Sequence, residues 1–515
     1  MGIVQGLNRN QIIMAPTLDE TVAADNPVRV LDALVDSLNL RKLGFPEPSA
    51  MGRPSYAAND LLKLYLYGYL HGIRSSRKLE AELLKNVELI WMLRSLRPDH
   101  KTIADFRRKN PKAFQKAFRE FVAILDGWGL IGKEIFAIDG TKIKASNNKK
   151  LNFSKKKLVD RIARIDDKIA LFVTELENND QAEEAPAQRV NVEDALASLK
   201  KRKEEYEACL SLLEITGDNE VSIVDPDARL MGNNRGGVEV SYNVQSAVDA
   251  KHCLAVEVNV TNNPSDHGQL SVMSKRVKKR LKIKRSFIVL ADKGYYNGED
   301  LFRCKKNKIV TIVARQKAGR EAPNKEFNAD KFTYVEGKDC YICPLGQELK
   351  RTGTRASRVY QNKKACEKCA EKTKCTTGVA KRFSVSHYQN VFIETDKRLA
   401  DNLELYRRRQ MIVEHPLGTI KRSMNGYYFL LRTIKKVRGE VALLFFAYNL
   451  KRVQNILGQQ ELMKRLASLL LCLFSFRDKL AAKWLQISRN YFEGEANMQI
   501  LTQSAVPSVV TRAPC

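Results

Sequence analysis

Three acidic residues, Asp139, Asp292 and Glu414, stand where they could do chemistry together. Asp139 and Asp292 each follow a short apolar run, and Glu414 lies in a segment with helical spacing. Two aspartates at the ends of neighbouring strands, with a glutamate on a helix over the same sheet edge, could converge on a pair of divalent cations. Hard oxygen ligands suit Mg²⁺, and a pair of such ions supports phosphodiester hydrolysis or transesterification.

Each of these acids is a weak signal when taken alone. Asp139 precedes a glycine and could belong to a simple turn, and the same holds for Asp292 in Ala-Asp-Lys-Gly. Glu414 could be a solvated helical residue or the partner of a nearby arginine. Spacing does not choose among the acids, and four others compete with them: Asp225, Asp249, Glu299 and Asp300.

The acids need a sheet to position them, and the patterning predicts one. Residues 134–144 and 286–294 are short β-type runs that contain an aspartate at or near their ends. Residues 238–248 and 253–260 alternate between apolar and polar positions around a turn, which predicts a β-hairpin. We expect a mixed α/β sheet whose catalytic groups lie at strand ends.

Helical patterns surround these strands. Residues 269–285 combine an apolar stripe with many Lys and Arg, which predicts an amphipathic helix with a basic outer face. Residues 383–394 return to β-type residues, and residues 400–458 are helical again. Within that last segment Val441–Leu450 is apolar on nearly every side, so we expect it to be buried.

The context of Glu414 decides among the acids. Three motifs contain the acids: Ala-Ile-Asp-Gly-Thr at Asp139, Ala-Asp-Lys-Gly-Tyr at Asp292, and Val-Glu-His-Pro-x-Gly-x-x-Lys at Glu414. With these motifs the sequence resembles the DDE transposases of bacterial insertion sequences, in the branch with a Tyr-Arg-Glu-Lys signature around its third acid and a Cys-rich insertion. The resemblance covers about residues 15–455. It implies an RNase H-like core in which these three residues are the catalytic, metal-binding acids.

One part of the signature departs from the family pattern. The family places its arginine four residues before the glutamate, where this chain has Gln410. Tyr406 and Arg409 are therefore interpreted as counterparts with a shifted phase, whereas Lys421 fits the pattern. Their implied role is to hold DNA phosphates near the cleaved bond, for which a guanidinium and an ammonium are suitable. The alternative is ordinary solvation of a basic helix.

Five cysteines gather in one short segment, which favours a metal over disulfides. They form two Cys-x-x-Cys pairs and one additional cysteine: Cys340, Cys343, Cys366, Cys369 and Cys375. This spacing is typical of a tetrahedral zinc ribbon, in which Zn²⁺ binding helps a small insertion to fold. Five residues compete for four ligand positions, and the alternative is unligated thiols in a reducing cell.

The charge of the chain indicates a polyanionic partner. The sequence has 88 Lys and Arg against 59 Asp and Glu, a formal net charge of +29. Such a field attracts nucleic acid and argues against a neutral metabolite. No apolar run reaches the ~20 residues that span a bilayer, and residues 1–11 lack a signal-peptide pattern. We expect a cytoplasmic protein without a membrane partner, associated with the nucleoid when bound to DNA.

A basic segment near the N-terminus is a candidate DNA contact. In residues 97–109 a Pro-Asp turn leads into a short helix that carries Lys101, Arg107 and Arg108. A helix laid in a major groove could look like this, and a solvated basic helix is an equal alternative.

The whole pattern predicts an α/β protein with an RNase H-like mixed-sheet catalytic core, an N-terminal helical domain, a helical-hairpin insertion and a Cys-rich insertion. Two charged stretches of helical period, 153–178 and 190–213, predict the hairpin. The expected segments are 1–130 for the helical DNA-binding domain, 131–152 for the first part of the core, 153–218 for the hairpin, 219–330 for the continued core, 331–382 for the zinc-ribbon-like insertion, 383–458 for the end of the core with the Glu414 helix, and 459–515 for a helical extension and an unassigned tail.

The expected function follows from the resemblance. A transposase would bind the terminal inverted repeats of its element, cleave phosphodiester bonds with two Mg²⁺ or Mn²⁺ ions and transfer the 3′-hydroxyl ends to target DNA. The resemblance also suggests a homodimer at paired DNA ends. Two alternatives stay open: a catalytically inactive DNA-binding regulator or remnant, and an RNase H-like nuclease without strand transfer.

Overall fold

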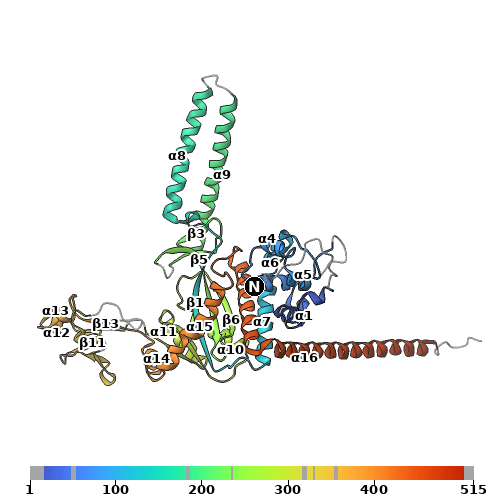
Figure 1. The fold of residues 1–515 in the computed structure, drawn as a ribbon. Coiled ribbons are helices and arrows are strands. Elements are labelled where there is room, and N and C mark those ends of the chain that lie inside the picture. The colour runs from blue at the N-terminus through green and yellow to red at the C-terminus, as the bar shows by residue number, and fades with distance from the viewer. Residues whose placement is uncertain are drawn as a thin grey trace, which may run out of the picture.

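A computed structural model of the chain describes residues 17–47, 54–180, 186–232, 236–315, 322–328, 331–352 and 358–503. Figure 1 shows a central sheet with covering helices, from which a long helical hairpin, a small β-rich module and the end of the last helix project. Among these residues no helix combines the length and the apolar character that a bilayer span requires.

The central sheet has six strands of mixed direction. Its order is β4-β5-β1-β7-β8, and β6 also pairs with β5. β1 runs antiparallel to β5 and parallel to β7, which is in turn parallel to β8. The strands are β1 (Ile135–Lys144), β4 (Arg229–Gly232), β5 (Val238–Asp249), β6 (Ala255–Thr261), β7 (Phe287–Ala291) and β8 (Ile309–Val313).

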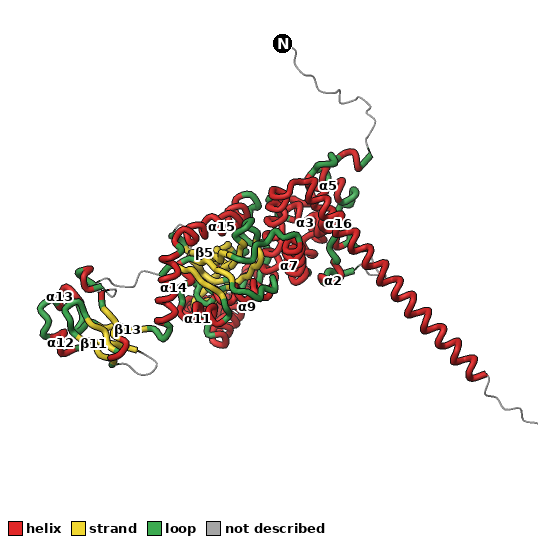
Figure 2. The backbone as a smooth tube through the Cα atoms, turned by 90° about the horizontal axis from the view of Figure 1, so that it is seen from below, coloured by secondary structure: helices red, strands yellow, loops and turns green. Residues whose placement is uncertain are grey.

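Helices bury both faces of this sheet because its strands are apolar on both sides. Ala137 and Leu290 pack under Val413 of helix α15 (Leu403–Arg422). Side chains alternate along a strand, so Phe136 and Ile138 join the main core instead. That core includes helices α10 (Gln269–Arg280) and α11 (Gly298–Lys306). Figure 2 shows the strands enclosed in this way, with α15 to one side and α11 to the other.

The N-terminal helical domain packs directly on the core. Phe121 of its last helix stacks on Phe446, with the ring centroids 4.7 Å apart. Phe446 belongs to the buried run that the sequence predicts, and every residue of Val441–Leu450 is buried. The helices of the domain are α1 (Pro27–Asp36), α2 (Leu40–Leu43), α3 (Ala58–Leu70), α4 (Ser76–Glu82), α5 (Val87–Met92), α6 (His100–Lys109) and α7 (Pro111–Gly127), after a 3₁₀ turn η1 (Asp19–Thr21).

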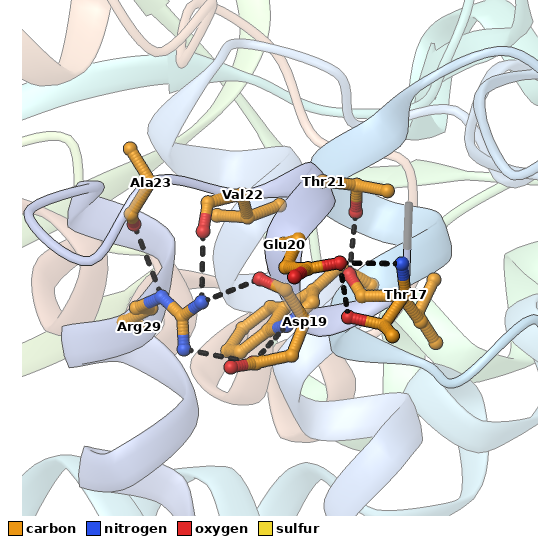
Figure 3. A network of polar contacts seen from close by, with 9 residues as sticks. Thr17, Asp19, Glu20, Thr21, Val22, Ala23 and Arg29 are labelled. Carbon is orange, nitrogen blue, oxygen red and sulfur yellow. Dashed lines mark hydrogen bonds and ion pairs between the residues drawn. The ribbon is translucent and has the colours of Figure 1, made fainter. Parts of the chain in front are cut away.

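A polar network fixes the start of this domain (Figure 3). The Arg29 guanidinium donates to the Asp19 carboxylate at 2.9 Å and to three backbone carbonyls, those of Asp19, Val22 and Ala23, at 2.8–3.0 Å. Arg29 also lies 4.7 Å from the ring centre of Trp91, whose Nε1 donates to Asp19. One side chain thus ties the first described turn to α1 and α5.

The predicted helical hairpin is present and has its own small core. It consists of α8 (Lys155–Asp180) and α9 (Pro186–Thr216), and its ends are brought together by β2 (Asn152–Ser154) and β3 (Glu220–Ser222). A 3₁₀ turn η2 (Lys149–Leu151) precedes it. The ring centroids of Phe153 and Tyr206 lie 5.2 Å apart at its base, and buried leucine and valine side chains pack with them. The hairpin projects from the sheet in Figure 1.

The Cys-rich segment forms a second, separate sheet, of order β13-β12-β11-β10-β9. It is a module of short elements, which is visible apart from the central sheet in Figure 1. The elements are η4 (Lys325–Phe327), β9 (Thr333–Val335), η6 (Glu336–Lys338), β10 (Cys340–Ile342), β11 (Glu348–Arg351), β12 (Arg358–Gln361), α12 (Lys363–Glu367), α13 (Lys372–Cys375) and β13 (Arg382–Val385).

The expectation of β-structure through residues 383–394 is wrong. β13 ends at Val385, and helix α14 (Gln389–Asp401) begins four residues later. Phe392 stacks on Tyr296 at 4.9 Å, and Val391 and Thr395 on the same helix are buried. The apolar residues of this segment therefore have a helical partner rather than a strand partner, which their β-branched composition does not reveal.

The last helix, α16 (Ile434–Gln503), contains a break. Gly458 has φ 71° and ψ 169°, so two helices meet there. Glycine adopts this backbone conformation without the steric penalty of a Cβ atom. The part before Gly458 is the buried helix of the core, and the part after it extends away from the domain in Figure 1.

A buried ion pair joins the helical domain to the core. Arg74, between α3 and α4, donates to Glu440 of α16 at 2.5 Å, and the two side chains are 1% and 0% exposed. Arg74 also donates to the carbonyls of Asn425 and Tyr428, and Glu440 accepts the N–H groups of residues 430 and 431. One pair thus holds together the α3–α4 turn, the 425–431 loop and α16.

We expect Glu440→Gln to destabilise the protein by about 3 kcal/mol or more, because it leaves the Arg74 charge buried without a counter-charge. Glu404→Gln is the control, since Glu404 pairs with Arg407 at an exposed site and such pairs contribute only ~0–1 kcal/mol. Urea unfolding measures both. Equal losses for the two variants would contradict the role of the buried pair.

Candidate active site

Backbone pairing brings Asp139 and Asp292 side by side. β1 and β7 are parallel neighbours whose register pairs Ile138 with Ala291. Each aspartate is the next residue along its chain, so the two lie at the same level, roughly one strand spacing of ~4.8 Å apart. Asp292 directly follows β7, but the expectation that Asp139 ends its strand is wrong, because β1 continues to Lys144 along β5. Asp139 also lies on the strand face of Ala137, which is the face that α15 covers.

The two carboxylates affect each other electrostatically. The pKa of Asp139 is raised to about 6, chiefly by burial and next by the negative charge of Asp292. The Arg409 guanidinium and the N–H of Gly140, at 2.9 Å from Asp139 Oδ1, oppose this shift in the pKa. Asp139 is thus a crowded carboxylate whose charge the surrounding protein compensates only in part.

A third carboxylate, that of Asp266, approaches this pair, and sequence reasoning did not identify it. Its charge also raises the pKa of Asp139. Asp266 Oδ1 accepts from Gln245 Nε2 at 2.7 Å and from Asn243 Nδ2 at 2.8 Å. The only sequence signal is its place in a turn that directly follows a β-type run, because β6 ends at Thr261.

The glycine after Asp139 is required by close packing. A Cβ atom on Gly140 would lie 2.4 Å from Gln245 Nε2 and 2.5 Å from Asp266 Oδ1. Real Cβ atoms do not approach other atoms so closely, and the Gln245 amide is buried and held by Tyr295 at 2.5 Å. The Asp-Gly pair is therefore more than a turn signal, since it lets the amide and Asp266 reach β1 beside Asp139.

Helix α15 brings cations to the aspartates. Lys421 Nζ donates to Thr141 Oγ1 at 2.5 Å, two residues beyond Asp139 on β1. Burial lowers the pKa of Lys421, and the charge of Asp139 opposes that shift. The guanidinium of Arg409 lies 5.8 Å from the ring centre of Tyr406, and among described residues its buried Nε has no partner. All three residues therefore face the region of the two aspartates.

The side chain of Glu414 on α15 is exposed. Its Oε1 accepts a hydrogen bond from Gln410 Nε2 at 2.8 Å. The contacts of the described residues do not join Glu414 to Asp139 or Asp292, so its role as the third acid stays a prediction. Gln410 occupies the family's arginine position and holds this glutamate, while its neighbour Arg409 lies near Asp139.

The competing acids have structural partners elsewhere. Asp249 accepts three backbone N–H groups at 2.9–3.2 Å. Asp300 accepts the N–H groups of Leu270 and Ser271 in the first turn of α10, both at 3.1 Å. Asp225 accepts from a tyrosine hydroxyl and from the backbone near α16, and Glu299 pairs with Arg303 on its own helix. The structure thus separates these acids from the Asp139–Asp292 pair.

The basic helix α6 contains one inward-facing arginine, which corrects a sequence expectation. Arg107 is 5% exposed, donates to the carbonyl of Arg74 at 2.9 Å and lies over the ring of Tyr65. Its charge is therefore not available to DNA. Arg108 is exposed and pairs with Asp105, and Lys101 is exposed. These two stay candidate DNA contacts.

Four of the five clustered cysteines line one small cavity in the Cys-rich module: Cys343, Cys366, Cys369 and Cys375. Burial raises the pKa of the Cys375 thiol, and the other three thiols raise it further. Cys340 is 2% exposed in β10 and does not line the cavity. The described cysteines are free thiols. Within the described ranges, no three His, Cys, Asp or Glu side chains form a ready-made metal site.

Two family models match this chain. Residues 16–109 match the family described as "Transposase domain (DUF772)", and residues 216–450 match the family described as "Transposase DDE domain". Together they span more than half of the sequence. The chain belongs to the DDE transposases of the insertion-sequence type. The second match contains Asp292 and Glu414, whereas Asp139 and the helical hairpin precede it.

Other comparisons add little to this assignment. A search of curated proteins found no match. Among solved structures, a piggyBac transposase synaptic complex with hairpin DNA is similar over 88% of this chain and 82% of that chain, with 8% identity and a TM-score of 0.31. A likeness of this extent carries no argument about the chain.

This DDE transposase therefore has a mixed α/β fold with an RNase H-like core, and it is a metal-dependent enzyme that acts on DNA. The donor chemistry at the strand ends fits a divalent cation. Asp139, Asp292 and Asp266 offer carboxylate oxygens, which Mg²⁺ and Mn²⁺ prefer, and their crowding raises the pKa of Asp139. A bound cation would relieve that crowding.

We expect Asp139→Asn to stabilise the metal-free transposase at pH 8 by about 1–3 kcal/mol. The pKa of Asp139 in the folded protein, about 6, exceeds its ordinary value of 3.8, so folding opposes ionisation. The penalty is absent below about pH 4, grows as the pH rises towards 6 and is complete above that value. Urea unfolding in EDTA at pH 4 and pH 8 measures it. A variant no more stable than the original protein at pH 8 would contradict this interpretation.

Proposed function

We propose that this transposase binds the terminal inverted repeats of its element, cleaves a phosphodiester bond at each end and joins the freed 3′-hydroxyls to target DNA. The observation that carries the proposal is the pairing of β1 with β7, which places Asp139 and Asp292 together. Cationic side chains of α15 lie beside them. Acids that can hold metal ions, next to groups that can hold phosphate, suit phosphodiester chemistry.

Asp139, Asp292 and Glu414 would hold two Mg²⁺ or Mn²⁺ ions. When bound, such ions activate an attacking oxygen and stabilise the leaving oxygen. Arg409 and Lys421 bind non-bridging phosphate oxygens and so orient the DNA strand over the aspartates. Tyr406 supports the Arg409 guanidinium through its ring. Asp266 is a further carboxylate beside Asp139, held in place by two amide side chains.

The position of Glu414 on its helix supports its part in this site. Glu414 and Lys421 are seven residues apart, which puts them on nearly the same face of α15. Lys421 reaches Thr141 on β1, so this face leads towards the strand of Asp139. A rotation of the Glu414 side chain away from Gln410 would free its carboxylate. Assembly as a homodimer on paired DNA ends remains part of the proposal.

The test is cleavage and joining of labelled DNA that carries the element's ends. We expect Asp292→Asn and Glu414→Gln each to lower Mg²⁺-dependent cleavage by at least ~100-fold, because each removes a charged metal ligand. Glu299→Gln is the control, since Glu299 is exposed and pairs with Arg303. Both thermal stability and DNA binding should be kept in the two acid variants.

Each alternative function has a distinct outcome in this assay. DNA binding without any metal-dependent nicking would indicate an inactive regulator or remnant. Cleavage without joining of ends to a target plasmid would indicate a nuclease. Full cleavage by Asp292→Asn, or in excess EDTA, would overturn the proposed site itself.

We further propose that the Cys-rich module holds a structural Zn²⁺ through Cys343, Cys366, Cys369 and Cys375. The four thiols line one cavity, and the pKa of the Cys375 thiol is raised first by burial and then by the charges of the other three. Zn²⁺ takes four thiolates in tetrahedral sites and would link the turn after β10 with α12 and α13. Cys340 is left out because it packs in β10, away from the cavity.

We expect the purified protein to contain one Zn²⁺ per chain, and Cys366→Ser/Cys369→Ser to lose it, because two of four thiolates are removed. Cys340→Ala is the matched control and should retain the metal. Elemental analysis of the purified proteins gives the zinc content. Retention of zinc by the double variant, or its loss from a folded Cys340→Ala variant, would contradict the ligand set.

A further inference from the structure

A basic cleft lies at the outer edge of the central sheet, away from the aspartates. It has a volume of about 130 Å³ and is formed by α7, β6, α10 and the first part of α16. β6 pairs with β5 alone among the described strands, so it is an edge strand, and β5 separates it from β1. Three arginines from three helices converge on the cleft: Arg119, Arg276 and Arg438.

The charges of these arginines are not matched by nearby carboxylates. The one acid that lines the cleft is Glu257, and it already pairs with Arg280 at 2.7 Å. Among the residues that the structure describes, Arg119, Arg276 and Arg438 form no ion pair. Arg438 donates to the carbonyl of Val260 at 3.2 Å, and its buried Nε has no partner within the described chain.

The electrostatic consequences are visible in the pKa values. Burial lowers the pKa of Arg119, and the charges of Arg280 and Arg276 lower it further. Burial also lowers the pKa of Arg438, and Arg276 adds to that shift. Glu257 and Asp227 oppose these effects only in part. The cleft thus holds positive charge that is partly removed from water and is repelled by its own neighbours, an arrangement that an anion would relieve.

The buried arginine Arg74 shows how this fold treats a guanidinium that serves packing alone. Its charge is met by Glu440, and its two terminal nitrogens also donate to the carbonyls of Asn425 and Tyr428, although among described residues its Nε has no partner. The cleft arginines differ because they come from separate helices, converge on a hollow and lack a carboxylate. The lack of a carboxylate alone would not set them apart, because Arg107 is buried without an ion pair among the described residues. Their convergence on an open hollow does.

We propose that this cleft binds a backbone phosphate of duplex DNA, as a contact separate from the catalytic strand ends. Guanidinium groups match phosphate oxygens in a fork geometry, and converging forks recognise one phosphate from several sides. The proposal rests on the proposed function for the choice of DNA as the source of the phosphate. The cleft lies two strands from β1, about 10 Å across the sheet, so it would hold DNA beside the catalytic region rather than in it.

The test compares two double variants with the same change in charge on the same two helices. Arg119→Gln/Arg276→Gln removes two cleft arginines, and Lys112→Gln/Lys279→Gln removes two exposed lysines of α7 and α10. Binding of a fluorescent random-sequence duplex is measured by anisotropy in EDTA over a series of salt concentrations. Catalysis is not needed for this readout, so a failure of the proposed cleavage reaction leaves the result interpretable.

We expect the cleft variant to bind DNA about 3–10-fold more weakly and to reduce the slope of log K against log salt by ~0.9, the value for one phosphate contact. The lysine variant should change each quantity by less than half as much. Arg119→Lys/Arg276→Lys keeps the charge and should recover most of the slope. If the glutamine variant is poorly folded, DNA binding by the Arg119→Lys/Arg276→Lys variant is compared with that of the original protein instead.

Two outcomes would overturn the proposal. The first is an unchanged salt slope in the cleft variant, or a change equal to that of the lysine variant. The second is stabilisation of the original protein by inorganic phosphate over chloride at equal ionic strength, lost in the cleft variant while DNA binding is unchanged. That result would identify a site for free phosphate rather than for DNA.

Discussion

Two like charges stand side by side in this transposase because backbone hydrogen bonds hold them there. The parallel pairing of β1 with β7 fixes the level at which Asp139 and Asp292 lie, and their backbones cannot move apart without breaking that register. Both faces of these strands are buried, so packing offsets the repulsion between the carboxylates. The site is therefore a product of the sheet, and the flanking elements adjust its charge.

Helix α15 brings positive charge to the two aspartates by packing on the sheet. Ile412 and Val413 bury one stripe of the helix against the sheet, and the same contact carries Arg409 and Lys421 towards Asp139. The arginines elsewhere in the chain also differ in whether a carboxylate pairs with them. The buried Arg74 has a buried carboxylate partner, Glu440. Among the described residues Arg409, Lys421 and the cleft arginines lack an ion pair, and they lie in the regions assigned here to DNA.

Local patterns in the sequence predict the elements that depend on neighbouring residues. They do not predict contacts between residues that are distant in the chain. The strands that carry Asp139 and precede Asp292 follow from short apolar runs, which depend on neighbouring residues alone. The continuation of β1 beyond Asp139 depends on its pairing with β5. Arg107 shows the limit, because its inward direction depends on α3 and the turn at Arg74, and a basic helix gives no sign of that. The position of Asp266 likewise depends on the Gln245 amide of β5, which donates a hydrogen bond to it. No spacing within the segment of Asp266 can indicate that contact.

The hairpin α8–α9 also bears on how the chain folds. β1 must pair with β5 across the whole inserted segment, a non-local contact that would ordinarily slow folding through the entropy of closing a long loop. The strands β2 and β3 bring the two ends of the insertion together, and the hairpin has its own small core. It can therefore form early as a cooperative unit, so that β5 searches for β1 over a much shorter effective distance.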